Sequence, residues 1–167
     1  MNIKTLQILL ILSILILSCK SHKEINRLAS ELKCDKTIEF IFDKQSNTVQ
    51  IEKVGPSIGE SKIPNYELTF NRAVEELNEN ITSELKVTET IGFPTDSILK
   101  IKVKIDKIVW NFRTADAVMN TDIIFYFDNK EIKTTGTNTV YMHGTKKGNL
   151  RKSIKSGIYE FLKIKCK

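Results

Sequence analysis

Apolar residues recur at helical spacing in two long segments of the chain. In each segment successive apolar positions lie three or four residues apart, so they would line one side of a helix. The first set is Phe70, Val74, Leu77, Ile81 and Leu85, and the second is Leu150, Ile154, Ile158, Phe161 and Leu162. The pattern predicts one amphipathic helix that opens near Pro64 and another between Asn149 and Lys165. We expect the charged residues off these stripes, such as Glu76 and Lys155, to be solvated.

Alternation of apolar and polar residues predicts a long β-strand in the second half of the chain. From Leu99 onwards every second residue is apolar, and the residues between them include Lys100, Lys102 and Lys104. This pattern is typical of a strand with one buried and one solvated face. After Asp106-Lys107 the apolar residues change parity, which predicts a β-bulge at that point. A hairpin turn at the same place is the alternative.

Five other segments have the composition of strands. They are residues 37–43, 48–54, 85–91, 117–127 and 131–143. We expect the first two to pair back as a hairpin, and we expect Gly136 to mark a bulge or a sheet edge. Helices packed on one face of an antiparallel sheet form a two-layer α+β domain, which is the fold class that the sequence predicts.

The first nineteen residues have a different pattern. Lys4 supplies a positive charge, and the run from Leu6 to Leu17 is almost entirely apolar. Such a run is typical of a secretory signal peptide and is short for a spanning helix, which needs about 20 residues. Its ending, Ile16-Leu17-Ser18-Cys19, resembles the lipobox of bacterial lipoproteins. In that family the cysteine, here Cys19, receives a diacylglyceryl group and its new amino group is acylated. The alternative is an uncleaved anchor helix with Cys19 incidental.

The resemblance implies three parts of the chain. Residues 1–18 form the signal peptide, residues 19–36 form the lipidated anchor with a short amphipathic helix, and residues 37–167 form a single α+β domain. The short helix is expected from about His22 to Leu32, because Ser21 and Glu24 have the spacing of a capping box. We expect this helix to dock on the domain.

Charge and cysteine content indicate which partners and which redox compartment to expect. Loss of Lys4 with the signal peptide lowers the formal net charge from +6 to +5, a balance that favours anionic lipids or wall polymers. Nucleic acid is not an expected partner, because no RNA-binding motif is present. With Cys19 acylated, Cys34 and Cys166 remain in an oxidising compartment, and we predict a disulfide bond between them. Two free thiols are the alternative.

Residue types that carry catalysis or bind metals are sparse. His22 and His143 lack the spacing of a zinc site, so we expect no metal and no cofactor. Asp106 and Asp122 could meet on neighbouring strands as an acid–base pair, but a solvated sheet face explains them better.

Lys100, Lys102 and Lys104, here called the lysine row, are a second candidate site. They could contact an anionic ligand or lipid headgroups. Equally, lysines on an exposed or edge strand prevent pairing with another chain, and this alternative is the simpler one.

Four segments carry a further resemblance. They are Ser57-Ile58-Gly59, Phe70–Leu85, Leu99–Phe112 and Leu150–Leu162. Their order is similar to that of small periplasm-facing lipoproteins of the curli-secretion and penicillin-binding-protein-activator type. The resemblance implies a related α/β domain and transfers no functional residues. Separately, Asp96-Ser97-Ile98 is similar to the O-glycosylation site of exported Bacteroidetes proteins.

We therefore expect a membrane-anchored lipoprotein that acts as a non-enzymatic binding or accessory module in the cell envelope. Lys20 follows Cys19, and lipoproteins that lack aspartate there tend to reach the outer membrane in enteric bacteria. The expected partners are the membrane, through the lipid anchor, and an envelope protein, wall or lipid component. The alternatives are an envelope hydrolase or transferase that uses Asp106 and Asp122, and a surface effector or immunity-type protein.

Overall fold

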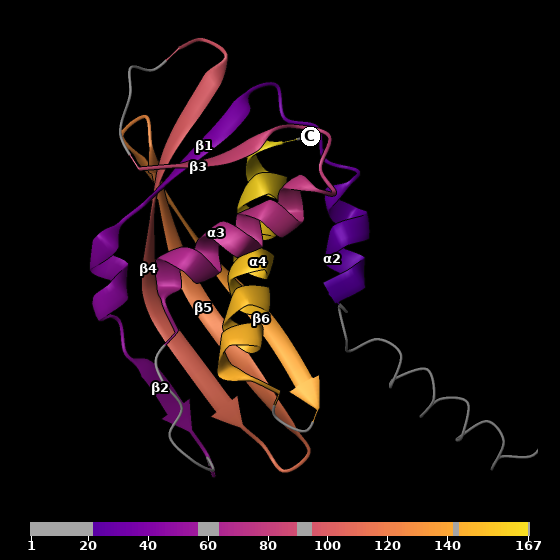
Figure 1. Ribbon diagram of the computed structural model, residues 1–167, viewed down its shortest axis with the longest axis vertical. Helices are drawn as coiled ribbons and strands as arrows, with labels where there is room; N and C mark the ends of the chain where they lie inside the picture. The colour runs from indigo at the N-terminus through magenta and orange to yellow at the C-terminus, as the bar shows by residue number, and fades with distance from the viewer. Residues whose placement is uncertain (1–21, 57–63, 90–94, 142–143, 167) are drawn as a thin grey trace, which may run out of the picture.

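The computed structural model describes residues 22–56, 64–89, 95–141 and 144–166 (Figure 1). The described helices are α2 (His22–Ala29), the short 3₁₀ helix η1 (Lys44–Thr48), α3 (Tyr66–Asn78) and α4 (Lys146–Lys165). The described strands are β1 (Thr37–Phe42), β2 (Ile51–Val54), β3 (Leu85–Thr88), β4 (Ile98–Phe112), β5 (Asp116–Phe127) and β6 (Lys130–Tyr141).

The strands form one sheet in the order β3-β1-β4-β5-β6, and β2 pairs with β4 as well. Strands β4, β5 and β6 are antiparallel neighbours, whereas β1, β2 and β3 pair in parallel. Helices α3 and α4 cross the same face of the sheet, and α2 lies beside α4 (Figure 1). The α+β class and the two layers are confirmed, with a sheet that is mixed rather than wholly antiparallel.

The predicted hairpin between segments 37–43 and 48–54 is wrong. Strands β1 and β2 both pair with β4 in parallel, so that Ile38 lies opposite Leu99. Helix η1 carries the chain from one to the other, and the Asp43 side chain caps it by accepting from the Gln45 N–H. The Ile105 N–H donates to the buried Ser46 hydroxyl at 2.9 Å. Between β1 and β2, the Ser46 side chain therefore accepts a β4 backbone hydrogen bond that a neighbouring strand would otherwise accept.

The predicted β-bulge near Asp106-Lys107 is confirmed. Strand β4 runs without a turn for 15 residues, which excludes the hairpin alternative. Its pairing with β5 shifts between Ile105 and Lys107, and Asp106 is the extra residue. Ile105 and Ile108 consequently both face the core, where each is fully buried. The bulge restores the inward parity of the apolar residues.

The core lies between the sheet and helices α3 and α4. At its centre Phe40 of β1 contacts Phe70 of α3 and Phe161 of α4, with ring centroids 5.8 Å and 6.3 Å away. Phe125 of β5 stacks on Phe161 at 4.1 Å. Both predicted apolar stripes are buried, although α3 ends at Asn78 and Leu85 begins β3.

Gly136 lies on the edge strand β6, so the sheet-edge alternative of the prediction is confirmed, and no bulge occurs there. The register between β5 and β6 is continuous across this position. A Cβ atom at Gly136 would instead collide with the Ser153 carbonyl oxygen and the Gly157 nitrogen of α4. The Thr134 hydroxyl donates to the Gly157 carbonyl at 2.9 Å in the same contact. Glycine is present here because the helix backbone approaches the strand closely.

Candidate functional site

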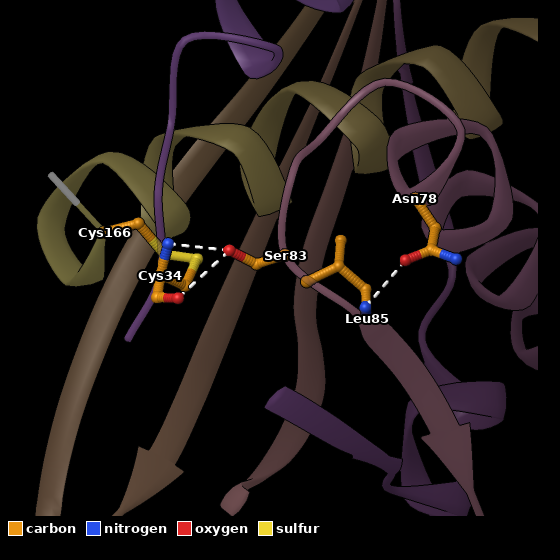
Figure 2. The surroundings of a disulfide bond; sticks show 5 residues. All are labelled: Cys34, Asn78, Ser83, Leu85 and Cys166. Carbon is orange, nitrogen blue, oxygen red and sulfur yellow. Dashed lines mark hydrogen bonds between the residues drawn. A yellow bond between two sulfur atoms is a disulfide. The ribbon is translucent and has the colours of Figure 1, made fainter. Parts of the chain in front are cut away.

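A disulfide bond joins Cys34 to Cys166 across 132 residues (Figure 2). Cys34 follows α2 and Cys166 ends α4, so the bond ties the N-terminal segment to the last helix. The Ser83 hydroxyl accepts from the Cys34 N–H at 2.7 Å and donates to the Cys34 carbonyl at 3.1 Å (Figure 2). The chain before β1, the loop before β3 and the end of α4 thus meet at one point.

Helix α2 docks on the domain, as the sequence predicts. It spans eight residues, His22–Ala29, and packs beside α4. Ile25 is only 6% exposed and Ala29 is fully buried in the main core. Cys19, the predicted lipidation site, and His143 lie outside the described residues. The described chain begins three positions after Cys19.

The lysine row lies on the sheet face opposite the helices, here called the outer face. Lys102 Nζ lies 2.9 Å from Asp43 Oδ2, and Lys100 Nζ lies 3.8 Å from Glu39 Oε2. Burial acts to raise the pKa of Asp43, but hydrogen bonds from Lys102 and the Gln45 N–H, and the charge of Lys104, leave it lowered. Cross-strand acids thus balance two of the three lysines, which favours a solvated sheet face.

Asp106 and Asp122 do come together on the outer face. Lys133 of β6 lies between them, with its Nζ 2.8 Å from Asp106 Oδ2 and 3.7 Å from Asp122 Oδ2. The hydrogen bond from Lys133 is the largest influence on the pKa of Asp106 and lowers it, despite the opposing effect of burial. A general acid needs a raised pKa, so this carboxylate is arranged for ion pairing rather than proton donation.

A charged cluster between α3 and α4 differs from the expectation that its members are solvated. The Lys155 side chain is fully buried, and its Nζ lies 3.2 Å from Glu76 Oε2. Arg151 Nε lies 3.0 Å from the other oxygen, Glu76 Oε1. Burial lowers the pKa of Lys155, and the hydrogen bond from Lys155 to Glu76 partly offsets that effect. The helical stripe alone carries no signal for this cluster, because it does not show where a second helix packs.

A small cavity lies between α3 and the edge strand β3. Its volume is about 210 Å³, and it is lined by Asn71, Val74, Glu75, Asn78, Leu85 and Val87. The Asn71 Oδ1 atom is buried, and no described residue forms a hydrogen bond with it. The Asn78 side chain accepts from the Leu85 N–H at 2.7 Å (Figure 2). Sequence analysis does not identify this cavity, because its residues carry no motif.

The described residues contain neither a membrane-spanning helix nor a cluster of metal ligands. None of the described helices is both long and apolar enough to cross a membrane. Across residues 22–56, 64–89, 95–141 and 144–166, no group of three or more histidine, cysteine, aspartate or glutamate residues could hold a metal ion.

Comparisons with known proteins place the chain in no family. No protein-family model matches the sequence, and no curated protein matches it. Seven chains of solved structures match. One of them, titled "Crystal structure of uncharacterized protein", is 13% identical, with 78% of this chain and 90% of that chain covered and a TM-score of 0.38. A similarity at this level carries no argument about fold or function.

Proposed function

We propose that this protein is a lipid-anchored, non-enzymatic binding or accessory module of a bacterial cell envelope, attached to the outer membrane through Cys19. The observation that carries the proposal is the segment Ile16-Leu17-Ser18-Cys19 behind an apolar run. The Cys34–Cys166 bond supports it, because disulfides persist in oxidising compartments outside the cytosol. The ion pairing of Asp106 supports a binding role over a carboxylate enzyme.

The short path from Cys19 to the folded domain suggests how the anchor acts. Only Lys20 and Ser21 separate Cys19 from α2. Three residue steps span at most about 11 Å when fully extended. Because α2 is docked through Ile25 and Ala29, the domain would be held directly at the bilayer surface. Its partner would therefore also be a component at or near the membrane.

The test is metabolic labelling of the full chain, expressed in a bacterium, with radioactive palmitate. Wild-type protein should incorporate the label, lose residues 1–18 and sediment with membranes. The Cys19→Ser variant should not incorporate it, whereas a variant with both Cys34 and Cys166 changed to Ala should still be labelled. Label retained by Cys19→Ser, or wild-type protein that keeps its leader, would overturn the proposal.

A further inference from the structure

Strand β3 exposes backbone hydrogen-bonding groups at one end of the sheet. Among the described strands it pairs only with β1, in parallel, with Ile38 opposite Leu85. The Ile38 N–H donates to the Glu84 carbonyl, so Ile38 faces β3. In a parallel ladder, successive residues of one strand turn their N–H and C=O groups to opposite sides. The backbone N–H and C=O groups of Glu84 and Lys86 therefore point to β1, and those of Leu85 and Val87 point to the free edge of the sheet.

The two outward residues differ in how their backbone groups are satisfied. The Leu85 N–H donates a hydrogen bond to the Asn78 side chain of α3. Val87 has no such cap among the described residues, which leaves a donor and an acceptor on the free edge. This arrangement suits the addition of one more strand, a mode in which proteins bind extended peptides.

The cavity between α3 and β3 opens beside this free edge and has a defined chemistry. Its apolar lining is formed by Val74, Leu85 and Val87. Asn71 also lines the cavity, and its buried Oδ1 has no hydrogen-bond partner among the described residues, although buried polar atoms are normally hydrogen-bonded. Glu75 also lines the cavity, is exposed and forms no ion pair with a described residue. Within the described part of the chain, the site thus offers one acceptor without a donor and one carboxylate without an ion pair, and a cationic donor would satisfy both.

We propose that the free edge of β3 binds an extended segment of a partner protein, antiparallel to β3, with a lysine or arginine opposite Val87. That residue would exchange two backbone hydrogen bonds with Val87, and its side chain would enter the cavity on the α3 side. Its charged nitrogen would donate to Asn71 Oδ1 and pair with Glu75. The residue before it in the segment would lie opposite Thr88, whose buried hydroxyl has no hydrogen-bond partner among the described residues.

A second copy of this chain and a small molecule both fit the site less well. A β3 strand from a second copy would present Leu85 and Val87 to the cavity, and neither carries a donor for Asn71. The volume of about 210 Å³ is below the ~300 Å³ at which small-molecule sites begin.

The opposite edge, β6, is less suited to this role. Its side chains are bound back to β5, since the Thr135 hydroxyl donates to Asp122 and the Thr137 hydroxyl donates to Asn120. Lys133 is likewise engaged by Asp106. Among the described residues, two buried polar atoms without a hydrogen-bond partner, Asn71 Oδ1 and Thr88 Oγ1, lie on α3 and β3, and none lies on β6.

This inference rests on the proposed binding role and assigns its protein contact to one sheet edge. The test uses the purified full chain and a fluorescent peptide, Ac-Thr-Val-Thr-Lys-Thr-Val-Thr-NH₂, with fluorescence polarisation as the readout. In the control peptide norleucine replaces the lysine. We expect saturable binding of the lysine peptide that is roughly tenfold tighter than that of the control, as a charge-assisted hydrogen bond predicts. The assay does not need acylated Cys19, so its failure would leave the anchoring proposal intact.

Two variants locate the binding. Val87→Pro removes the outward N–H without touching the ladder to β1, and it should weaken peptide binding at least about tenfold. Glu75→Gln should reduce the preference for lysine over norleucine, whereas Glu79→Gln, the same charge change outside the cavity lining, should leave it unchanged. Unchanged binding to a folded Val87→Pro protein, equal affinity for the two peptides, or no saturation up to about 1 mM would overturn the proposal.

Discussion

Lys155 Nζ of α4 lies 3.2 Å from Glu76 Oε2 of α3, and the Lys155 side chain is fully buried. The contact joins the two helices that cover the sheet. Because Arg151 also pairs with Glu76, one carboxylate serves two cations. The two ends of this contact therefore do not contribute equally to stability.

Removal of Glu76 should cost more than removal of Lys155. In Glu76→Gln the buried ammonium loses the carboxylate that lies 3.2 Å from its Nζ, and removing one partner of a fully buried pair costs about 3–5 kcal/mol. Because the Glu76 side chain is 26% exposed, we expect the free energy of unfolding to fall by only about 2 kcal/mol. Lys155→Met keeps the volume, removes the buried charge and should change stability by only about 1 kcal/mol. Urea unfolding of both variants would measure the order, and a larger loss in Lys155→Met would contradict it.

The same lysine should make stability depend on alkaline pH. Burial lowers the pKa of Lys155 below 10.5 in the folded protein. Between that lowered pKa and 10.5 the unfolded chain binds the proton more than the folded chain does, so this group's contribution to stability rises with pH. The unfolding free energy of wild type minus that of Lys155→Met should therefore increase as the pH rises through this window.

Lys163 provides an internal control of opposite sign. Its hydrogen bond to Glu160 raises the pKa of Lys163, so its contribution is present below 10.5 and is lost as the pH rises through the folded pKa. The difference between wild type and Lys163→Met should accordingly shrink over the same titration. If both differences in unfolding free energy changed in the same direction with pH, the buried lysine would not be the source of the effect.

Gly136 should tolerate no side chain. In Gly136→Ala the new methyl group meets the backbone of Ser153 and Gly157, which cannot move as a flexible side chain would. We expect a loss of roughly 2–3 kcal/mol, the upper range for overpacking. Thr135→Ala, one residue earlier on the exposed face of β6, should cost less than about 1 kcal/mol. Thermal unfolding of the two proteins would compare them, and equal melting temperatures would contradict the close approach.

Local patterns were sufficient for the features that depend on neighbouring residues. The parity change after Asp106 is visible in the sequence because a bulge alters inside-out alternation within a few positions. The burial of Phe70 and Phe161 follows from helical spacing in the same way. The alternation also places Lys102 on the outer face, but it gives no sign of its partner Asp43, which lies in another segment, at the start of η1.

Features that depend on distant segments were not predictable. The parallel pairing of β1 and β2 with β4 requires η1 to bridge them, and no local pattern distinguishes that path from a hairpin. The burial of Lys155 depends on the position of α3, far away in the chain. The cavity at Asn71 likewise exists only because α3 lies against β3. A single sequence shows which residues are apolar, but it does not show which elements pack together.

The Cys34–Cys166 bond should contribute much of the stability of the domain. It closes a loop over 132 residues, for which the chain-entropy relation gives about 5 kcal/mol. Changing both cysteines to Ala should lower the unfolding free energy by up to this amount, as measured by urea denaturation without reductant. Adding reductant should destabilise wild type and leave the double variant unchanged. Equal urea midpoints for wild type and the double variant would contradict this role.

The short connection between Cys19 and α2 makes the proposed anchoring testable by distance. Because two residues separate them, a dye on the domain should lie close to a dye in the bilayer of vesicles that carry the acylated protein. Insertion of 20 Gly/Ser residues after Ser21 should raise the mean separation by about 25 Å, the root-mean-square length of such a flexible chain, and should lower energy transfer. The same insertion after Asn129, in the exposed turn between β5 and β6, should not move the domain away from the membrane. Low transfer in the wild-type protein would show that α2 is not docked when the protein is anchored.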